Sequence, residues 1–283
     1  MTAPARAPVI RPEALTALAE RLAAVDGIVG VLLGGSRARG DHTPESDVDL
    51  GLYYRPPLDV GALGELAREL AGPAATVTQP GDWGPWVDGG GWLTVAGTPV
   101  DWLYRNLDRV HVAWADAQAG RYTFHAQVGH PLGVPDFAYA GEVALGVVLA
   151  DPTGELHDLR EQTRAYPPRL AVALVEGLWE ASFLIDNARK AVARGDTTYI
   201  AGCLFRVVGL CAHALHGRVG RWLINEKGAV TAAGRLEIAP QGFSAQAHGV
   251  LATIGTAAVE LTAALDHAAD LVARTRAACR GTR

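Results

Sequence analysis

The segment from Ile28 to Tyr54 places the tightest limits on the fold of this 283-residue chain. Its apolar run IVGVLL predicts a buried strand, and SDVDLGLYY predicts a second strand after a glycine-rich turn and a polar loop. Because successive side chains of a strand point to opposite faces, Asp47 and Asp49 project to the same side, with Cβ atoms roughly 6 to 7 Å apart. Two carboxylates so placed repel each other unless they share a cation, and Mg²⁺ prefers oxygen ligands. The segment therefore predicts a magnesium site, with an exposed edge strand of solvated carboxylates as the alternative.

The turn between the two strands has the composition of a phosphate-binding loop. Gly34 and Gly35 let the backbone approach an anion closely, and Ser36 can begin a helix whose free N–H groups point at phosphate oxygens. Arg37 and Arg39 add positive charge beside it. Gly35, Ser36 and Arg37 are therefore the candidate nucleotide-binding residues of the turn. The chain has no Gly-x-x-x-x-Gly-Lys-Ser/Thr run, which disfavours a P-loop phosphotransferase.

A third carboxylate follows on a later strand. The runs WLTVA and VDWLYR, joined by a Gly-Thr-Pro turn, predict a hairpin whose second strand carries Asp101. Asp101 can close the metal site as a further carboxylate. Trp83, Trp86 and Trp92 belong to a glycine- and tryptophan-rich stretch here, where they either stack on a nucleobase or an acceptor ring, or simply anchor the hairpin.

Periodicity and composition divide the chain at about residue 150. Hydrophobic residues make up 49% of the chain and charged residues 19%, which is enough for a sizeable core. Residues 1–150 predict a small α/β head, whereas residues 151–283 contain three long helical patterns, at 169–195, 199–217 and about 244–279. The expected fold is α+β: a small mixed-sheet head followed by a C-terminal helical bundle that contributes to the cleft.

The Gly-Gly-Ser turn, the Asp-Val-Asp pair that begins eleven residues after the serine, and the later Val-Asp-Trp strand resemble the nucleotidyltransferase superfamily that includes DNA polymerase β. Within it, the pattern most resembles the antibiotic-type enzymes, such as the kanamycin, streptomycin and lincosamide nucleotidyltransferases, which also have a helical C-terminal domain. The resemblance implies Mg²⁺-dependent transfer of a nucleoside monophosphate from a nucleoside triphosphate such as ATP to an acceptor hydroxyl, with release of pyrophosphate.

The same resemblance implies roles for the matched residues. Ser36 would hold the terminal phosphates, and Asp47 with Asp49 would hold the metals. Asp101 would be a third metal ligand or the general base, a role that varies among members of the superfamily.

Lysine is scarce in this chain, which contains only Lys190 and Lys227. On the helix that holds Lys190, Glu176 and Glu180 fall on the same side at helical spacing. If this side faces the cleft, Lys190 reaches the triphosphate and one of the glutamates lies near the acceptor, with Glu176 as the alternative general base. A solvated outer face is the other interpretation.

One further motif points to a different class of enzyme. Arg206 and His213 on an apolar helix resemble the Arg-x₄₋₆-His pair of HEPN ribonucleases. Ordinary packing and surface positions explain most such pairs on bundle helices, and we favour that interpretation.

Charge and composition narrow the partners. The formal net charge of −5 argues against a nucleic-acid partner and against a membrane surface, because such binders usually carry a strong basic face. No secretion signal and no stretch of about 20 predominantly apolar residues is evident, so the sequence predicts a cytoplasmic protein. The expected acceptor is a small hydroxylated molecule, aminoglycoside-like or lincosamide-like, as in antibiotic resistance. Two alternatives stay open: AMP transfer to a protein side chain, as in antitoxins of this superfamily, and nucleotide binding without catalysis.

Overall fold

The computed structural model describes residues 10–40, 42–43 and 46–281, which form two compact units. The first nine residues, where the sequence predicts no secretion signal, lie outside the described part. The first unit takes the described residues up to Ala115, with Gln127–Gly129 and Tyr139–Ala165; the second takes Asp116–Ala126, His130–Ala138 and the residues from Tyr166 on. The division into domains at residue 150 stays a prediction about independently folding parts.

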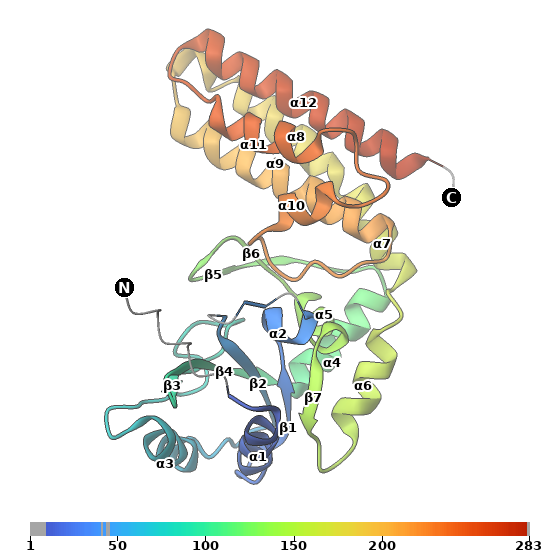
Figure 1. The fold of residues 1–283 in the computed structure, drawn as a ribbon. Coiled ribbons are helices and arrows are strands. Elements are labelled where there is room, and N and C mark those ends of the chain that lie inside the picture. Colours follow the sequence, from blue (N-terminus) through green and yellow to red (C-terminus); the bar gives the residue numbers. More distant parts are fainter. Residues whose placement is uncertain (1–9, 41, 44–45, 282–283) are drawn as a thin grey trace, which may run out of the picture. The chain divides into compact units, whose positions relative to one another are not determined.

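The first unit is built on a five-stranded mixed sheet (Figure 1). The strand order is β3-β4-β2-β1-β7, in which β2 and β4 are parallel and the other neighbours are antiparallel. The strands are β1 (Ile28–Leu33), β2 (Val48–Tyr54), β3 (Gly90–Val95), β4 (Thr98–Asn106) and β7 (Val147–Ala150). The helices that lie wholly or mostly in this unit are α1 (Pro12–Ala23), α2 (Gly35–Arg39), α3 (Val60–Ala71), α4 (Leu107–Gln118), α5 (Ala138–Leu145) and α6 (Glu155–Thr163).

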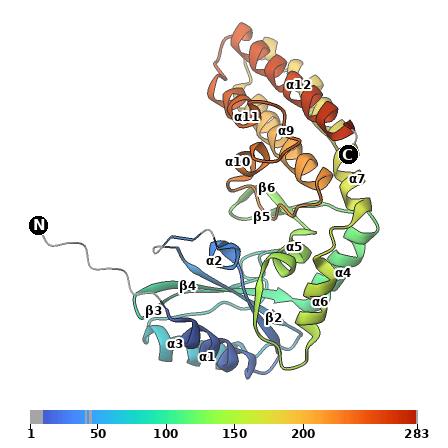
Figure 2. The ribbon, with the colours of Figure 1, turned by 45° about the vertical axis from the view of Figure 1, so that its right-hand side comes forward.

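Side chains alternate across this sheet, as the sequence predicts. On β2, Val48, Leu50 and Leu52 are buried in a core shared with α1 and α3, and these two helices cover one face of the sheet (Figures 1 and 2). Asp49 and Gly51, which alternate with them, belong to the opposite face and are only partly buried. The alternation therefore leaves one face of the sheet free to carry polar chemistry.

The second unit is a helical bundle with a two-stranded hairpin. In it α8, α9 and α12 pack against one another, and α9 supplies much of the core. Its elements are β5 (Phe124–Gln127), β6 (His130–Pro135), α7 (Pro168–Glu176), α8 (Leu178–Arg189), a short 3₁₀ helix (Val192–Arg194), α9 (Thr197–Arg218), α10 (Ala229–Gly234), α11 (Phe243–Ala252) and α12 (Ala258–Arg280). The α+β prediction, with a mixed-sheet head followed by helices, is confirmed.

One predicted helix, over residues 169–195, is interrupted at Gly177 into α7 and α8. The backbone at Gly177 keeps a helical conformation, and its N–H still donates to the carbonyl of Ala173 at 2.8 Å. The hydroxyl of Tyr122 lies against this glycine, so a Cβ there would overlap it. Close packing of an aromatic side chain thus explains the glycine within an otherwise helical pattern.

The alanine-rich helix expected over about 244–279 is also two helices, α11 and α12. The carboxylate of Glu260, in the first turn of α12, accepts hydrogen bonds of 3.0 Å from the backbone N–H groups of Thr256 and Ala257. These bonds satisfy donors at the new helix start, which is why the chain ends one helix here and begins another.

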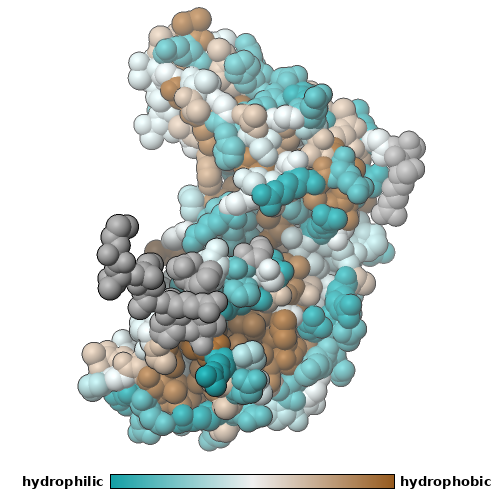
Figure 3. Space-filling model, viewed as in Figure 1, coloured by the Kyte–Doolittle hydropathy of each residue, from teal (hydrophilic) through white to brown (hydrophobic). Residues whose placement is uncertain are grey.

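Helix α9 corrects the expectation that the chain contains no long apolar stretch. By length and composition it could cross a membrane, yet 61% of its most apolar window is buried inside the protein. Hydrophilic and weakly polar side chains cover most of the visible face of the second unit, with hydrophobic ones in scattered patches (Figure 3). The apolar residues of α9 thus serve as the core of a helical bundle.

Candidate active site

Two of the predicted carboxylates, Asp49 and Asp101, lie side by side on one face of the sheet, next to the glycine turn. Asp49 of β2 pairs directly with Asp101 of β4 in the parallel register. On the other side of β2, the N–H of Gly34 donates to the carbonyl oxygen of Asp49 at 2.8 Å. Since directly paired residues of neighbouring strands share a face, the register places the glycine turn, Asp49 and Asp101 in sequence across β1, β2 and β4.

The glycine turn is fitted against the carboxylate of Asp49. Gly35 has a positive φ of 61°, and a Cβ at this position would overlap the Asp49 carboxylate. Only glycine meets both demands without strain. The second glycine of the Gly-Gly-Ser motif is therefore required by the backbone conformation and by the close approach of Asp49.

The segment that follows the turn is held by Arg37. Its Nε donates to the carbonyl oxygen of Asp47 at 3.0 Å, and its Nη2 donates to that of Ser46 at 2.7 Å. Asp47 is exposed and directly precedes β2, although the sequence predicts it within the strand. Arg37 thus fixes the backbone at Asp47, a role that the sequence did not suggest beside its predicted contact with phosphate.

The negative charges of Asp49 and Asp47 act on the carboxyl group of Asp101. Burial, and then the negative charges of Asp49 and Asp47, raise the pKa of Asp101 from 3.8 to about 6. Burial disfavours a charged carboxylate, and nearby like charges disfavour it further. A cation placed among these groups would relieve both effects, so the row is a favourable place for one.

Residues 13–76 match the family model of the nucleotidyltransferase domain. The match includes the glycine turn, Asp47 and Asp49, whereas Asp101 lies beyond it. It supports a transferase of the nucleotidyl class, as the sequence predicts. The antibiotic-type subfamily stays a prediction.

Among solved structures, a nucleotidyltransferase-like protein from Exiguobacterium sibiricum 255-15 is similar over 93% of this chain and 74% of its own, with a TM-score of 0.46 and 15% sequence identity. Among curated proteins, no sequence matches this chain.

Nucleotidyltransferase domains generally use a divalent metal, so the donors of the candidate site bear on whether a metal can bind here. Among residues 10–40, 42–43 and 46–281, no three histidine, cysteine or carboxylate side chains lie close enough together to hold a metal ion by themselves. Asp47, Asp49 and Asp101 nevertheless offer only hard oxygen donors, and the negative charges of Asp49 and Asp47 act on the carboxylate of Asp101. These properties fit Mg²⁺, which retains waters and is usually completed by substrate phosphates.

The candidate residues of the helical unit make contacts of their own. Lys190 caps the end of α8, and its Nζ donates to Oδ1 of Asn187 at 2.9 Å. Glu180 is ion-paired with Arg206. Glu176 lines a cavity of about 420 Å³ within this unit. The proximity of Lys190 or Glu176 to the carboxylates of the candidate site stays a prediction.

The ribonuclease interpretation of Arg206 and His213 does not fit the structure. His213 is 1% exposed, lies between the rings of Phe124 and Phe137, and neither ring nitrogen has a hydrogen-bond partner among the described residues. Burial lowers its pKa to about 3, so the imidazole is neutral. A histidine so enclosed is a packing residue, because it cannot reach an RNA backbone.

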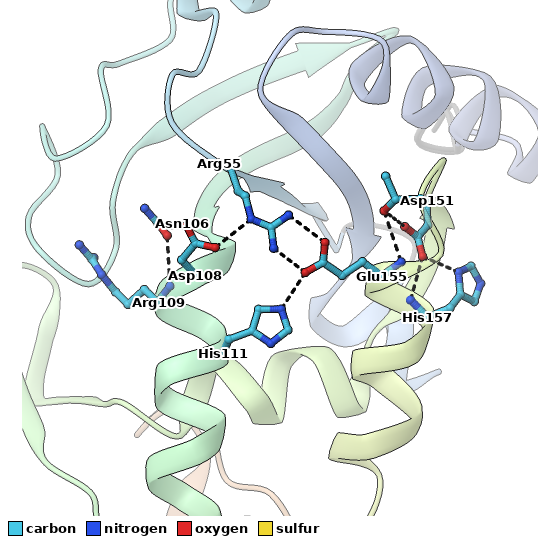
Figure 4. Close-up of polar contacts among 9 residues, drawn as sticks. Arg55, Asn106, Asp108, Arg109, His111, Asp151, Glu155 and His157 are labelled. Atoms are coloured by element: carbon cyan, nitrogen blue, oxygen red, sulfur yellow. Dashed lines mark hydrogen bonds and ion pairs between the residues drawn. The ribbon is translucent and has the colours of Figure 1, made fainter.

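A second polar cluster, which the sequence did not reveal, lies beyond the other end of β2 (Figure 4). Arg55, directly after the strand, donates from Nη1 and Nη2 to both carboxylate oxygens of Glu155 on α6, at 2.8 and 2.5 Å. Its Nε donates to Asp108 of α4 at 2.8 Å, and Nε2 of His111 lies 2.9 Å from Glu155. The cluster ties the end of β2 to two helices. Arg55 and Glu155 are 100 positions apart in the chain, so no local sequence pattern predicts their contact.

Proposed function

We propose that this protein transfers a nucleoside monophosphate from a nucleoside triphosphate to a hydroxyl of a small-molecule acceptor and releases pyrophosphate. The observation that carries this proposal is the register that sets Asp101 beside Asp49, next to the glycine turn. Carboxylates that share one face beside an anion-accepting turn suit a divalent cation and a triphosphate together.

Each group of the row has a distinct part in this reaction. Asp47 and Asp49 hold Mg²⁺, with Asp101 as a third ligand or as the base. When bound, Mg²⁺ neutralises charge on the triphosphate and lowers the pKa of a hydroxyl beside it. The backbone of the turn and the hydroxyl of Ser36 bind the terminal phosphates, and Arg37 keeps Asp47 in place through its backbone carbonyl.

The chemical step is a displacement at the α-phosphorus. The acceptor oxygen forms a bond to this phosphorus while the bond from the phosphorus to the oxygen that bridges it to the β-phosphorus breaks. Pyrophosphate leaves with the electron pair of the broken bond. The acceptor proton passes to the carboxylate of Asp101, which lies one strand further from the turn than Asp49 does.

We further propose that the helical unit supplies a cation to the triphosphate through Lys190. The hydrogen bond to Asn187 at the exposed end of α8 would give way to a phosphate oxygen. Lys190→Ala should then weaken triphosphate binding by about 1.5 to 3 kcal/mol, as for a charged hydrogen bond, with acceptor affinity unchanged. If calorimetry gives the same triphosphate affinity for Lys190→Ala and wild type, Lys190 is a solvated surface residue that does not contact the triphosphate.

The composition supports a small acceptor in the cytoplasm. A net charge of −5 and an acidic row disfavour a nucleic-acid strand, which would meet repulsion along its phosphates. An uncharged or amine-bearing hydroxyl compound meets no such repulsion. Nucleoside triphosphates are abundant in the cytoplasm, where we place the reaction.

The test is direct detection of the product. Purified protein is incubated with Mg²⁺, each nucleoside triphosphate in turn and a panel of hydroxylated small molecules, and adducts are sought by mass spectrometry beside a pyrophosphate assay. We expect an acceptor whose mass grows by one nucleoside monophosphate, with equal release of pyrophosphate. The Asp49→Asn protein serves as the blank. Adducts formed equally by that variant would refute the assigned site.

A further inference from the structure

The polar row continues onto β3 with an exposed aromatic side chain. Trp92 pairs directly with Asp101 in the antiparallel register of β3 and β4. It therefore shares the face that carries Asp49 and Asp101. Trp92 is 70% exposed, whereas Leu93, the next residue on the other face, is buried in the core. A large apolar ring thus stands in water one strand away from a candidate catalytic carboxylate.

The ring of Trp92 is held in a defined position. One face stacks on Trp83, with ring centroids 4.3 Å apart and planes inclined by 15°. Trp83 in turn is fixed through its backbone, because its carbonyl oxygen accepts a hydrogen bond of 2.7 Å from Nε2 of Gln127. The Oε1 atom of the same Gln127 accepts from the N–H groups of Trp86 and Val87, each at 3.0 Å.

Other contacts hold the remainder of the loop that carries Trp83. The hydroxyl of Tyr139 donates to the carbonyl oxygen of Trp86 at 2.5 Å, and the buried Asp88 accepts a hydrogen bond from Tyr54. Arg109 lies over the ring of Trp86, 5.6 Å from its centroid. The loop is thus tied down at several points. A stack presented by so constrained a loop loses little conformational freedom when a ligand binds.

We propose that the open face of Trp92 binds the acceptor of the nucleotidyl transfer, and that it selects a hydroxyl carried on a flat-faced ring over one on an open chain. This inference rests on the proposed function, because it assigns the acceptor subsite of the same site. A sugar, a cyclitol or a phenol presents an apolar ring face to indole while its hydroxyl groups point outward. With the ring on Trp92, such a hydroxyl lies beside Asp101.

The order of the groups across the sheet distinguishes the acceptor from the nucleobase. Neighbouring strands are about 4.8 Å apart, so the backbone of Trp92 is roughly 5 Å from that of Asp101 and, measured across the sheet, roughly 15 Å from the glycine turn. The triphosphate lies toward the turn and the α-phosphorus near Asp49. The position beyond Asp101, on the side away from the phosphates, is where the attacking hydroxyl must arrive. The aromatic platform occupies that position.

The experiment compares ring-borne and open-chain hydroxyls in wild-type, Trp92→Ala and Trp92→Phe proteins. Methyl β-D-glucopyranoside, 2-deoxystreptamine and phenol are the ring probes, and glycerol and sorbitol are the open-chain probes. Thr94→Ala, which changes an exposed residue two positions along the same strand face, is the matched control. Circular dichroism and thermal unfolding check that each variant is folded.

We expect Trp92→Ala to raise the KM of the best ring acceptor on the order of 5- to 50-fold, as for loss of one stacking partner, with the KM of the triphosphate within about twofold. Trp92→Phe should recover most of the loss, and Thr94→Ala should match the wild type. A rise in the KM of the triphosphate alone would overturn the inference, because the ring would then hold the nucleobase. Equal use of ring and open-chain acceptors by wild type would overturn it as well.

A binding measurement separates this inference from the proposed reaction. Saturation-transfer difference NMR, recorded without nucleotide or metal, should show transfer to the ring protons of at least one ring probe. The signal should disappear in Trp92→Ala and persist in Asp49→Asn. If no acceptor is ever modified but this pattern holds, the proposed reaction fails and the ring subsite stands. If no ring probe receives saturation from the wild type, or the signal survives in Trp92→Ala, the subsite is refuted.

Discussion

The two ends of strand β2 place carboxylates in opposite electrostatic surroundings. Near its start, Asp49 lies beside Asp101 and Asp47, and burial together with these like charges raises the pKa of Asp101 to about 6. Just beyond its end, hydrogen bonds from Arg55 lower the pKa of Glu155 to about 2. The first cluster brings together carboxylates alone, whereas in the second the guanidinium of Arg55 pairs with the carboxylates of Asp108 and Glu155.

This difference separates a binding site from a structural clamp. Like charges held close together on a sheet destabilise the fold, so such a cluster is expected where a ligand supplies the missing charge. A guanidinium that meets two carboxylates in good geometry needs no ligand and fixes the elements that carry it. The four predictions below test this division, from the largest expected effect to the smallest.

The largest effect is expected for Asp49→Asn at the like-charged end. The change removes a charged metal ligand and leaves an isosteric amide against Gly35, so the fold should persist. We expect turnover to fall by more than the roughly 10²- to 10⁴-fold that a general base contributes, and metal-dependent triphosphate binding to weaken. Calorimetry with Mg²⁺ and single-turnover assays measure both. Glu65→Gln, an exposed residue of α3, controls for the loss of one charge.

Asp101→Asn separates the base from a metal ligand. If Asp101 takes the acceptor proton, the variant keeps Mg²⁺-dependent triphosphate binding, and its single-turnover rate falls by about 10²- to 10⁴-fold. The loss should lessen as pH rises, because the acceptor hydroxyl then ionises without help. Weakened metal binding would show that Asp101 is a ligand. Wild-type turnover would remove it from the site, and Glu176 would become the next candidate base.

The same substitution should stabilise the metal-free protein at alkaline pH. Since the pKa of Asp101 is about 6 in the folded state and 3.8 ordinarily, the folded state retains the proton between these values. Stability then falls as pH rises from about 4 to about 6 and stays lower above that range. After allowance for solvent screening, Asp101→Asn should raise the free energy of unfolding by about 1–2 kcal/mol at pH 8, and by nothing at pH 3.

Urea unfolding in EDTA at the two pH values measures this difference. Mg²⁺ added to the wild type at pH 8 should recover part of the stability. A stability gain of equal size at pH 3 and pH 8 would show that the neighbouring charges are not its cause.

The smallest effect is expected for Glu155→Gln, in the cluster that is paired with Arg55. Its folded pKa is lowered from 4.5 to about 2, so its contribution is complete above about 4.5 and is lost as pH falls toward 2. The side chains of Arg55 and Glu155 are 39% and 29% exposed, so we expect a loss of only about 1 kcal/mol at pH 7, reduced by salt. Turnover should stay within about twofold of wild type.

The matched control for this variant is Glu161→Gln on the same helix, where the glutamate is 66% exposed and pairs locally with Arg164. We expect no measurable loss of stability from it. A large loss of turnover in Glu155→Gln, with stability intact, would instead show that the Arg55 cluster takes part in the reaction and is not only a structural clamp.

Local chemistry made part of this architecture predictable. The period-two alternation around Asp49 requires one polar face, and the demand for a positive φ at Gly35 requires glycine, so the strands and the turn follow from the segment itself. The apolar stripes of the later helices likewise predict a bundle. They do not predict that the first pattern divides at Gly177, where the close approach of Tyr122, from elsewhere in the chain, accounts for the glycine.

The sequence by itself determined which residue types could form a metal and phosphate site, together with the strand, the turn and the two carboxylates that flank Val48. Only the tertiary structure decided that Asp101 stands beside Asp49, because the register of β2 and β4 depends on the packing of distant segments against each other. That pairing also brings Trp92, which neighbours Asp101 in the hairpin of β3 and β4, onto the same face. The tertiary structure also decided that Arg55 is clamped by Glu155, a residue 100 positions away. Pairings of this kind arise when the chain closes long loops around a core, and no local pattern of side chains encodes them.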